Sequence, residues 1–308
     1  MKIVSEINSI AKLTRAGNLV IIALSLFLVR YLVVKPFLFL DNTESSISDF
    51  QFSLLTLAVV LIAAGGYVIN DIFDVQIDAI NKPGKNLVGS YYSKKTARIL
   101  YAALTIGGIA TAIVFGEGTG IKYSILIIAF SAGLLYFYSS SYKKMLLAGN
   151  LTISFLTGLN IFISILFDDQ SLHNESVLTI VTAFTIFAFL MTLGREIIKD
   201  CEDAQGDENF GASTLPVVAG LKTGRITASL VFSVVLGLLI WIQVSVKQWE
   251  DIISFGYVVI VIQLPLLYLI AASALSKSAS SDHKCSNIAK FIMITGLLAM
   301  VIFNISFN

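Results

Sequence analysis

Charged side chains are scarce in this sequence: Asp, Glu, Lys and Arg make up 13% of its 308 residues, whereas 56% of the residues are apolar. A soluble domain carries roughly 25% charged residues, so this chain has too little charge to cover a water-facing surface. The mean hydropathy is +0.85. The composition therefore predicts an integral membrane protein and excludes a soluble globular enzyme.

Other shortages narrow the function. The formal net charge is only +1, so overall basicity gives no support for nucleic-acid binding. The two cysteines, Cys201 and Cys285, are too few for a disulfide framework and form no metal-ligand cluster. The two histidines, His173 and His283, fall in loops that we expect on opposite sides of the membrane, which excludes a shared metal site.

Long apolar runs, in contrast, are abundant. A helix needs about 20 largely apolar residues to cross a bilayer, and the chain divides into nine such runs. We therefore predict an all-α polytopic membrane protein, a single domain over residues 1–308. Its nine helices are expected to form a bundle. The runs lie near residues 18–34, 50–69, 99–115, 123–141, 146–167, 176–194, 223–245, 252–273 and 288–307.

The first 17 residues have a different pattern. Ile3, Ile7, Ile10 and Leu13 recur at helical spacing beside basic residues. This pattern predicts an interfacial amphipathic helix over residues 1–17 that leads into the first span.

Basic residues set the expected orientation. With the N-terminus in the cytoplasm, 17 of the 21 Lys and Arg residues fall on the cytoplasmic side. The positive-inside bias therefore predicts a multi-pass cell-membrane protein with a cytoplasmic N-terminus and an outside C-terminus. Arg30 lies four residues before the end of the first predicted span, and we expect its side chain to extend to the outer headgroups.

Two acidic motifs follow spans two and six, on the predicted cytoplasmic side. In each motif three aspartates stand at positions i, i+3 and i+7, which places them on one helical face. Each motif is expected to continue its transmembrane helix beyond the membrane surface. The first acidic motif is Asp71, Asp74 and Asp78, and the second acidic motif is Asp200, Asp203 and Asp207.

Six aligned carboxylates need compensating charge, since two of them about 4 Å apart repel by roughly 4 kcal/mol at an effective dielectric constant of about 20. Oxygen ligands without His or Cys favour a hard cation, Mg²⁺ in particular, which usually bridges carboxylates to substrate phosphates. The motifs therefore predict Mg²⁺ and a diphosphate substrate. The competing interpretation is that the motifs are two solvated helix ends. It does not explain why the aspartates share one helical face or why the pattern occurs twice.

Neighbouring residues supply candidates for binding the diphosphate and for proton transfer. Basic side chains can form charge-assisted hydrogen bonds with phosphate oxygens, and Lys85 and Lys199 lie close to the acidic motifs. Glu196 and Asp200 are candidates for accepting a released proton. The full set of expected substrate-binding residues is Arg15, Asn70, Lys85, Lys144, Arg195 and Lys199.

These residues resemble the UbiA-type intramembrane prenyltransferases. Asn70, Asp71, Asp74 and Asp78 match that family's first motif, Asn-Asp-x-x-Asp-x-x-x-Asp, and Asp203 with Asp207 matches its second. The residues 194–207, followed by Gly211 and Thr214-Leu215-Pro216, look most like the digeranylgeranylglyceryl phosphate synthase branch. The resemblance covers essentially the whole chain and implies nine transmembrane helices around a cytoplasm-facing active-site cavity.

The resemblance also implies a reaction. A prenyl group is expected to pass from an allylic isoprenoid diphosphate, with geranylgeranyl diphosphate as a candidate, to a lipophilic acceptor, the hydroxyl of a glycerol-phosphate ether lipid. Asp71, Asp74, Asp200 and Asp203, with Glu196, are the expected catalytic residues. The other acceptor considered is an aromatic or quinone-precursor ring, and the other function considered is secondary transport. The oligomeric state is left open.

Overall fold

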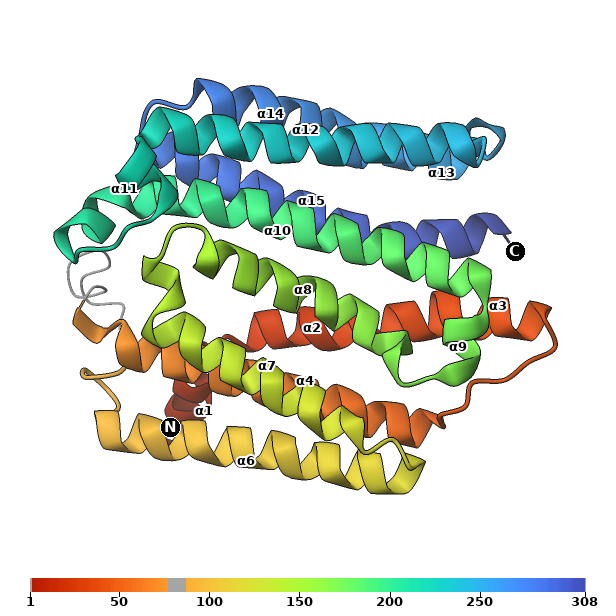
Figure 1. Cartoon of the computed structure of the whole chain (residues 1–308), viewed down its shortest axis with the longest axis horizontal. Coiled ribbons are helices and arrows are strands. Elements are labelled where there is room, and N and C mark those ends of the chain that lie inside the picture. The colour runs from red at the N-terminus through yellow and green to blue at the C-terminus, as the bar shows by residue number, and fades with distance from the viewer. Residues whose placement is uncertain (1, 77–86, 308) are drawn as a thin grey trace.

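The computed structural model covers the whole chain and describes residues 2–76 and 87–307 (Figure 1). Its regular elements within these ranges are helices. They are α1 (Lys2–Leu13), α2 (Ala16–Val29), α3 (Lys35–Leu40), α4 (Asp49–Phe73), α6 (Lys94–Thr119), α7 (Tyr123–Ser140), α8 (Ala148–Leu166), α9 (Asp169–His173), α10 (Glu175–Asn209), α11 (Leu215–Ala219), α12 (Leu221–Ser245), α13 (Ile252–Tyr257), α14 (Leu264–Leu275) and α15 (Ala279–Phe307).

The predicted number of spans is confirmed: in the described part of the chain, nine helical stretches are long and apolar enough to cross a membrane. Most of them are longer than the apolar runs that predicted them. The sixth, Glu175–Asn209, extends 15 residues beyond the run predicted to end at residue 194. The helix continues into polar sequence because its backbone hydrogen bonds do not depend on an apolar surface.

Two spans contain a π-helical segment that ends two residues before a proline. Arg30–Val34 precedes Pro36 between α2 and α3, and Val258–Gln263 precedes Pro265 between α13 and α14. Proline cannot donate the backbone hydrogen bond that an α-helix requires. A wider turn at this point keeps each helix continuous across the membrane.

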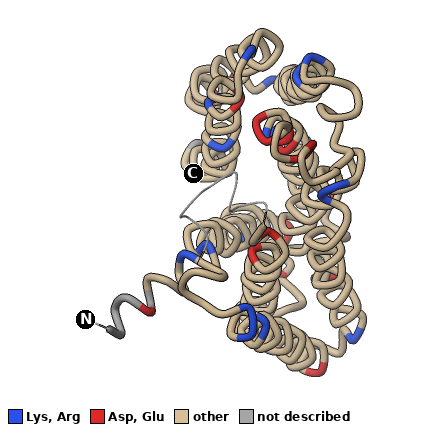
Figure 2. The backbone as a smooth tube through the Cα atoms, turned by 90° about the vertical axis from the view of Figure 1, so that its left-hand side faces the viewer, with Lys and Arg blue, Asp and Glu red and all other residues tan. Residues whose placement is uncertain are grey.

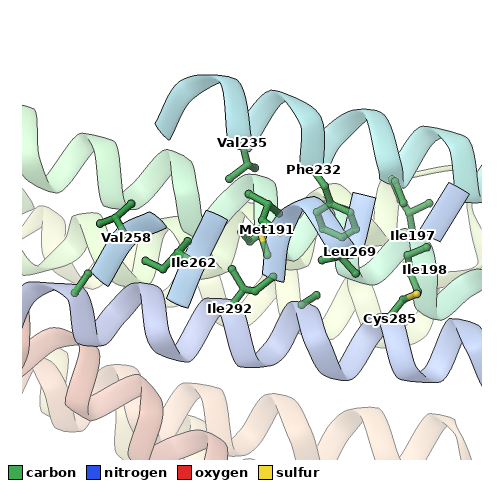
Figure 3. Close-up of a cluster of buried hydrophobic side chains, with 14 residues drawn as sticks. Met191, Ile197, Ile198, Phe232, Val235, Val258, Ile262, Leu269, Cys285 and Ile292 are labelled. Carbon is green, nitrogen blue, oxygen red and sulfur yellow. The ribbon is translucent and has the colours of Figure 1, made fainter. Parts of the chain in front are cut away.

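Apolar side chains pack the helices into one bundle. One cluster joins α10, α12, α14 and α15, where Met191, Phe232 and Ile292 point toward one another (Figure 3). A second cluster joins α2, α4, α6, α7 and α8, and a third lies between α2, α8, α10 and α15. At Gly194 an added Cβ would lie 2.4 Å from the Phe232 ring, so the glycine is what allows α10 and α12 to approach so closely.

The described residues of both acidic motifs lie at the same end of the bundle. We call this end, which contains residues 70–76, 141–147 and 200–214, the motif end. Figure 2 looks onto this end and shows acidic and basic segments on the ends of several helices. The N-terminal helix α1 ends at Leu13, short of the predicted residue 17, and a turn at Arg15 with φ 52° joins it to α2. The chain therefore enters the bundle at the motif end and leaves α15 at the opposite end (Figure 1).

Arg30 does not extend to the membrane surface as predicted. Its side chain is 1% exposed, and it donates hydrogen bonds to Asp49 Oδ1 (3.0 Å) and to the carbonyl oxygen of Ile47 (2.7 Å). Its guanidinium also lies 4.6 Å from the centre of the Phe52 ring. The prediction was wrong because the connection before α4 supplies the acceptors that water or lipid headgroups were expected to supply.

Candidate active site

A cavity of ≈ 520 Å³ opens among α2, α4, α7, α8, α10 and α15. Its charged lining comes from the motif end of these helices. The charged residues that line it are Arg15, Asp74, Lys143, Lys144, Arg195, Glu196, Lys199, Asp200, Asp203, Asp207 and Lys290.

The rest of the cavity is mainly apolar and extends into the membrane-spanning part of the bundle. The apolar side chains that line it include Ile21, Ile22, Leu135, Ile153, Leu156, Ile161, Phe184, Phe187, Met293, Ile294 and Leu297. Sixteen positions of α10 separate Asp200 from Phe184, which is about 24 Å at 1.5 Å per residue. The site thus joins a charged end to a long hydrocarbon-like compartment.

The second acidic motif lies as the spacing predicts, since all three of its aspartates are on α10 and line the cavity. Asn150 on α8, which is buried, donates a 2.7 Å hydrogen bond to Asp200. Thr214 donates a 3.3 Å hydrogen bond to Asp207. Neutral donors therefore fix two of the three carboxylates in place.

The first acidic motif differs from the prediction. The helix α4 ends at Phe73, and Asp74 occupies its C-cap with φ −85° and ψ 0°, so one regular helix does not carry the three aspartates. Asp74 accepts a hydrogen bond from Asn70 at 2.8 Å and forms an ion pair with Lys143. Two predicted site residues, Asp78 and Lys85, lie outside the described residues.

Asp71 has a partner in the turn before the first span. Arg15 lies 3.1 Å from its carboxylate, and the same guanidinium lies 4.9 Å from the centre of the Tyr67 ring. Arg15, Tyr67 and Asn70 line the cavity, whereas Asp71 is not among the lining residues found in the described chain. Arg15 thus links α1 and α2 to the first acidic motif.

Glu196 lies one turn deeper than Asp200 and contacts two cations. Arg195 donates to one of its oxygens at 2.7 Å, and Lys199 lies 3.3 Å from the other. All three residues line the cavity, and Lys144 lines it from the α7–α8 connection. The predicted basic residues Arg15, Lys144, Arg195 and Lys199 are therefore brought together with the acidic motifs.

Two functional residues are missing from the predicted set. Lys143 pairs with Asp74, and Asn150 pairs with Asp200. Lys144 was among the predicted substrate-binding residues, but the spacing along the chain gave no reason to add its neighbour Lys143. Nothing in the sequence around Asn150 indicates a function, because it is a single asparagine in an apolar run with no charged residue three or four positions away.

The donor set suits a hard cation. The acidic side chains that line the cavity offer only oxygen atoms as metal ligands, and no His or Cys is among the described lining residues. In the described ranges no group of three His, Cys, Asp or Glu side chains is close enough together to hold a metal ion. Mg²⁺ usually takes one or two carboxylates together with water and substrate phosphates, so the separate carboxylates of the two motifs fit a metal that is shared with a phosphate substrate.

Comparisons with known proteins match nearly the whole chain. A sequence model of the UbiA prenyltransferase family matches residues 18–295. The digeranylgeranylglyceryl phosphate synthase of Methanobrevibacter smithii is 31% identical over 97% of this chain and 97% of that protein.

Solved structures agree in fold. A digeranylgeranylglyceryl phosphate synthase structure aligns over 98% of this chain and 99% of its own, with a TM-score of 0.67 and 26% identity. A UbiA homolog from Archaeoglobus fulgidus bound to GPP and Mg²⁺ aligns over 95% of this chain and 99% of its own, with a TM-score of 0.54 and 17% identity. On the length of the family match and the agreement of the fold, this chain belongs to the UbiA prenyltransferase family.

Proposed function

We propose that this protein transfers a prenyl group from an allylic isoprenoid diphosphate to the hydroxyl of a glycerol-phosphate ether lipid. One observation carries the proposal: carboxylates of both acidic motifs and several basic side chains line one end of an otherwise apolar cavity. A prenyl diphosphate has the same division, with a charged head and a hydrocarbon tail. The diphosphate fits the motif end, and the prenyl chain fits the apolar compartment.

Mg²⁺ is the proposed cofactor. Asp71, Asp74 and Asp78 of the first acidic motif, with Asp200, Asp203 and Asp207 of the second, would hold it. When bound, the ion supplies positive charge to the departing diphosphate. The support is the oxygen-only donor set, together with the Mg²⁺ bound by the Archaeoglobus fulgidus homolog.

The chain's own residues account for the remaining steps. The bond between the allylic carbon and the diphosphate oxygen breaks while basic side chains such as Lys143, Lys199 and Arg15 stabilise the charge on the leaving group. The apolar walls keep water from the allylic carbon. The acceptor oxygen then forms the new carbon–oxygen bond, and its proton passes to a carboxylate at the boundary between the two compartments, for which Asp200 and Glu196 are the candidates.

The acceptor class rests on similarity to named relatives. Digeranylgeranylglyceryl phosphate synthases match this chain over nearly its whole length, and a geranylgeranyl donor is proposed on the same ground. An aromatic ring as the acceptor and transport without chemistry are the alternatives that an assay separates.

The test is a product assay with purified protein. The enzyme is incubated with Mg²⁺ and geranylgeranyl diphosphate, and with either a geranylgeranylglyceryl phosphate or an aromatic acid, and the products are identified by mass spectrometry. We expect an ether product with the glycerol-phosphate lipid and none when EDTA is present. A prenylated aromatic acid, or solute movement into liposomes without diphosphate release, would contradict the proposal.

We also propose that the motif end faces the cytoplasm, with α1 lying on that membrane surface. The support is the distribution of basic residues between the two ends of the spans. A reporter fused after residue 308 tests this orientation. A reporter that works only outside the cytoplasm should give a signal at this position. A signal from a reporter that works only in the cytoplasm would contradict the orientation.

A further inference from the structure

Lys290 lines the cavity without belonging to either acidic motif. It stands on α15 on the same face as Met293, Ile294 and Leu297, which also line the cavity. Within the described chain its side chain forms no ion pair or hydrogen bond, whereas Arg15, Lys143 and Lys199 each pair with a carboxylate. An ionisable side chain within a membrane span is costly and usually marks a polar ligand.

The depth of Lys290 follows from two contacts between α10 and α15, which run in opposite directions. Nearer the motif end, His283 lies 2.8 Å from Glu202. Deeper in the bundle, an added Cβ at Gly296 would lie 2.5 Å from Phe187. Lys290 stands about midway, level with residues 193–195 of α10, and is thus about 9 Å deeper than Asp200 at 1.5 Å per residue.

Asn18 lines the cavity from the neighbouring helix α2, at a depth between those of Asp200 and Lys290. Asn160 on α8 donates a 2.8 Å hydrogen bond to Ser25 on α2, and these two helices run in the same direction. Asn18 lies two turns nearer the motif end than Ser25, which makes it level with position 153 of α8. Position 153 is about one turn deeper than Asn150, which bonds Asp200. Asn18 lines the cavity, its side chain forms no hydrogen bond within the described residues, and it lies on a helix in contact with α15.

We infer that Lys290 and Asn18 form the binding subsite for the phosphate group of the lipid acceptor, an inference that rests on the proposed function. The reaction brings two phosphorylated lipids into one cavity, and the acidic motifs account for the diphosphate of only one. The second phosphate needs its own cation and hydrogen-bond donor, and this pair supplies both. Its position at the boundary of the apolar compartment places the acceptor's glycerol beside the end of the donor's prenyl chain that reacts.

The subsite implies specificity for a phosphorylated acceptor. A lysine–phosphate contact is a charge-assisted hydrogen bond, and removing it costs about 10- to 100-fold in affinity. The cost falls on the acceptor alone if the donor diphosphate is bound at the acidic motifs. A lysine that only extends to lipid headgroups would affect neither substrate.

The experiment compares Lys290→Gln, Lys290→Arg and Asn18→Leu with a control, Lys284→Gln. Lys284 is an exposed lysine on the same helix, as Lys290 is, but it does not line the cavity. Each variant is assayed with the phosphorylated glyceryl ether and with the same lipid without its phosphate. Binding of the phosphorylated lipid in the absence of donor is measured by calorimetry. Thermal melting confirms that each variant is folded.

We expect Lys290→Gln to raise the KM for the phosphorylated acceptor, and to weaken its binding, by about 10- to 100-fold. The KM for the donor should stay within about twofold, and the phosphate-free lipid should be used equally by the variant and the wild type. Lys290→Arg should restore most of the loss, and Asn18→Leu should show a smaller effect of the same kind.

Acceptor parameters for Lys290→Gln that equal those of Lys284→Gln would overturn the inference. So would a rise in the KM for the donor instead. If the wild-type protein uses neither glyceryl lipid, the proposed function itself fails. Wild-type activity with no acceptor effect in the variants defeats only the subsite.

Discussion

Asn150 on α8 donates a 2.7 Å hydrogen bond to Asp200 on α10. Asn150 lies at the start of α8, directly after the connection that contains Lys143. Lys143 pairs with Asp74, and the carbonyl oxygen of Lys144 accepts a 2.7 Å hydrogen bond from the backbone N–H of Ser213. Residues 143–150 therefore contact both acidic motifs and the loop after the second. This short segment sets how the two motifs stand relative to each other.

Removing the amide of Asn150 tests the importance of this bond. Asn150→Leu keeps the size of the side chain but leaves the Asp200 carboxylate without its donor. We expect kcat/KM for prenyl transfer to fall by about 10- to 100-fold, as for other residues that orient ligating groups. Activity is compared by product assay and folding by thermal melting. Unchanged kcat/KM in a folded variant would show that Asp200 needs no such support.

Gly149 provides a backbone test of the same segment. An added Cβ would lie 2.7 Å from the Cα of Lys143, and backbone cannot move aside as a flexible side chain can. Gly149→Ala should therefore displace Lys143 from Asp74 and cost about 1–3 kcal/mol of stability. Gly133→Ala is the control, since nothing lies within 4 Å of its added Cβ. Equal melting temperatures and activities for the two variants would contradict the predicted clash.

Much of the fold follows from the sequence because a bilayer leaves so few possibilities. Nine apolar runs predict nine crossing helices, since only helices and closed barrels satisfy backbone groups in lipid. The spacing of Asp200, Asp203 and Asp207 places them on one face because α10 stays regular through all three. The same reasoning fails at Asp74, because α4 ends one residue earlier.

Arg30 gives a prediction for the opposite end of the bundle. Because its buried guanidinium bonds Asp49 and the Ile47 carbonyl, Arg30→Met should destabilise the protein by about 3 kcal/mol. Thermal melting measures the loss, and the double variant with Asp49→Asn should recover part of it. A melting temperature equal to that of wild type would instead fit an arginine that extends freely to the headgroups.

Asp168 is a second buried charge at this end. Its side chain is 0% exposed and accepts hydrogen bonds from the hydroxyl groups of Ser45 (2.6 Å), Ser46 (2.7 Å) and Ser171 (2.7 Å). Burial raises the pKa of Asp168, but these bonds and the Ser46 backbone N–H lower it by more, so the pKa lies below its usual value. The folded protein therefore favours the ionised form.

This shift predicts a pH dependence of stability. A lowered folded-state pKa adds stability above the unfolded value of about 3.9, and that contribution is lost as the pH falls through the folded pKa. The difference in melting temperature between wild type and Asp168→Asn should be large at pH 7 and should shrink on acidification below about pH 4. A difference that stays constant over this range would contradict the assigned role.

The pairings that build the site were beyond sequence reasoning. Arg15–Asp71, Lys143–Asp74 and Asn150–Asp200 join residues that are 56, 69 and 50 positions apart. Each depends on how two helices pack, and a helical period relates only residues three or four positions apart. Arg30 was misjudged for the same reason, since its partner Asp49 lies 19 residues away beyond a connection.

The central claim is that both acidic motifs bind one diphosphate. Calorimetric titration of the purified protein with inorganic diphosphate, in the presence of Mg²⁺, measures this directly. Asp74→Asn and Asp203→Asn are compared with Glu117→Gln, whose carboxylate is exposed at the opposite end. The account predicts that each aspartate variant loses at least about tenfold in affinity while Glu117→Gln binds as the wild type does. Wild-type affinity in either aspartate variant would contradict a site shared by the two motifs.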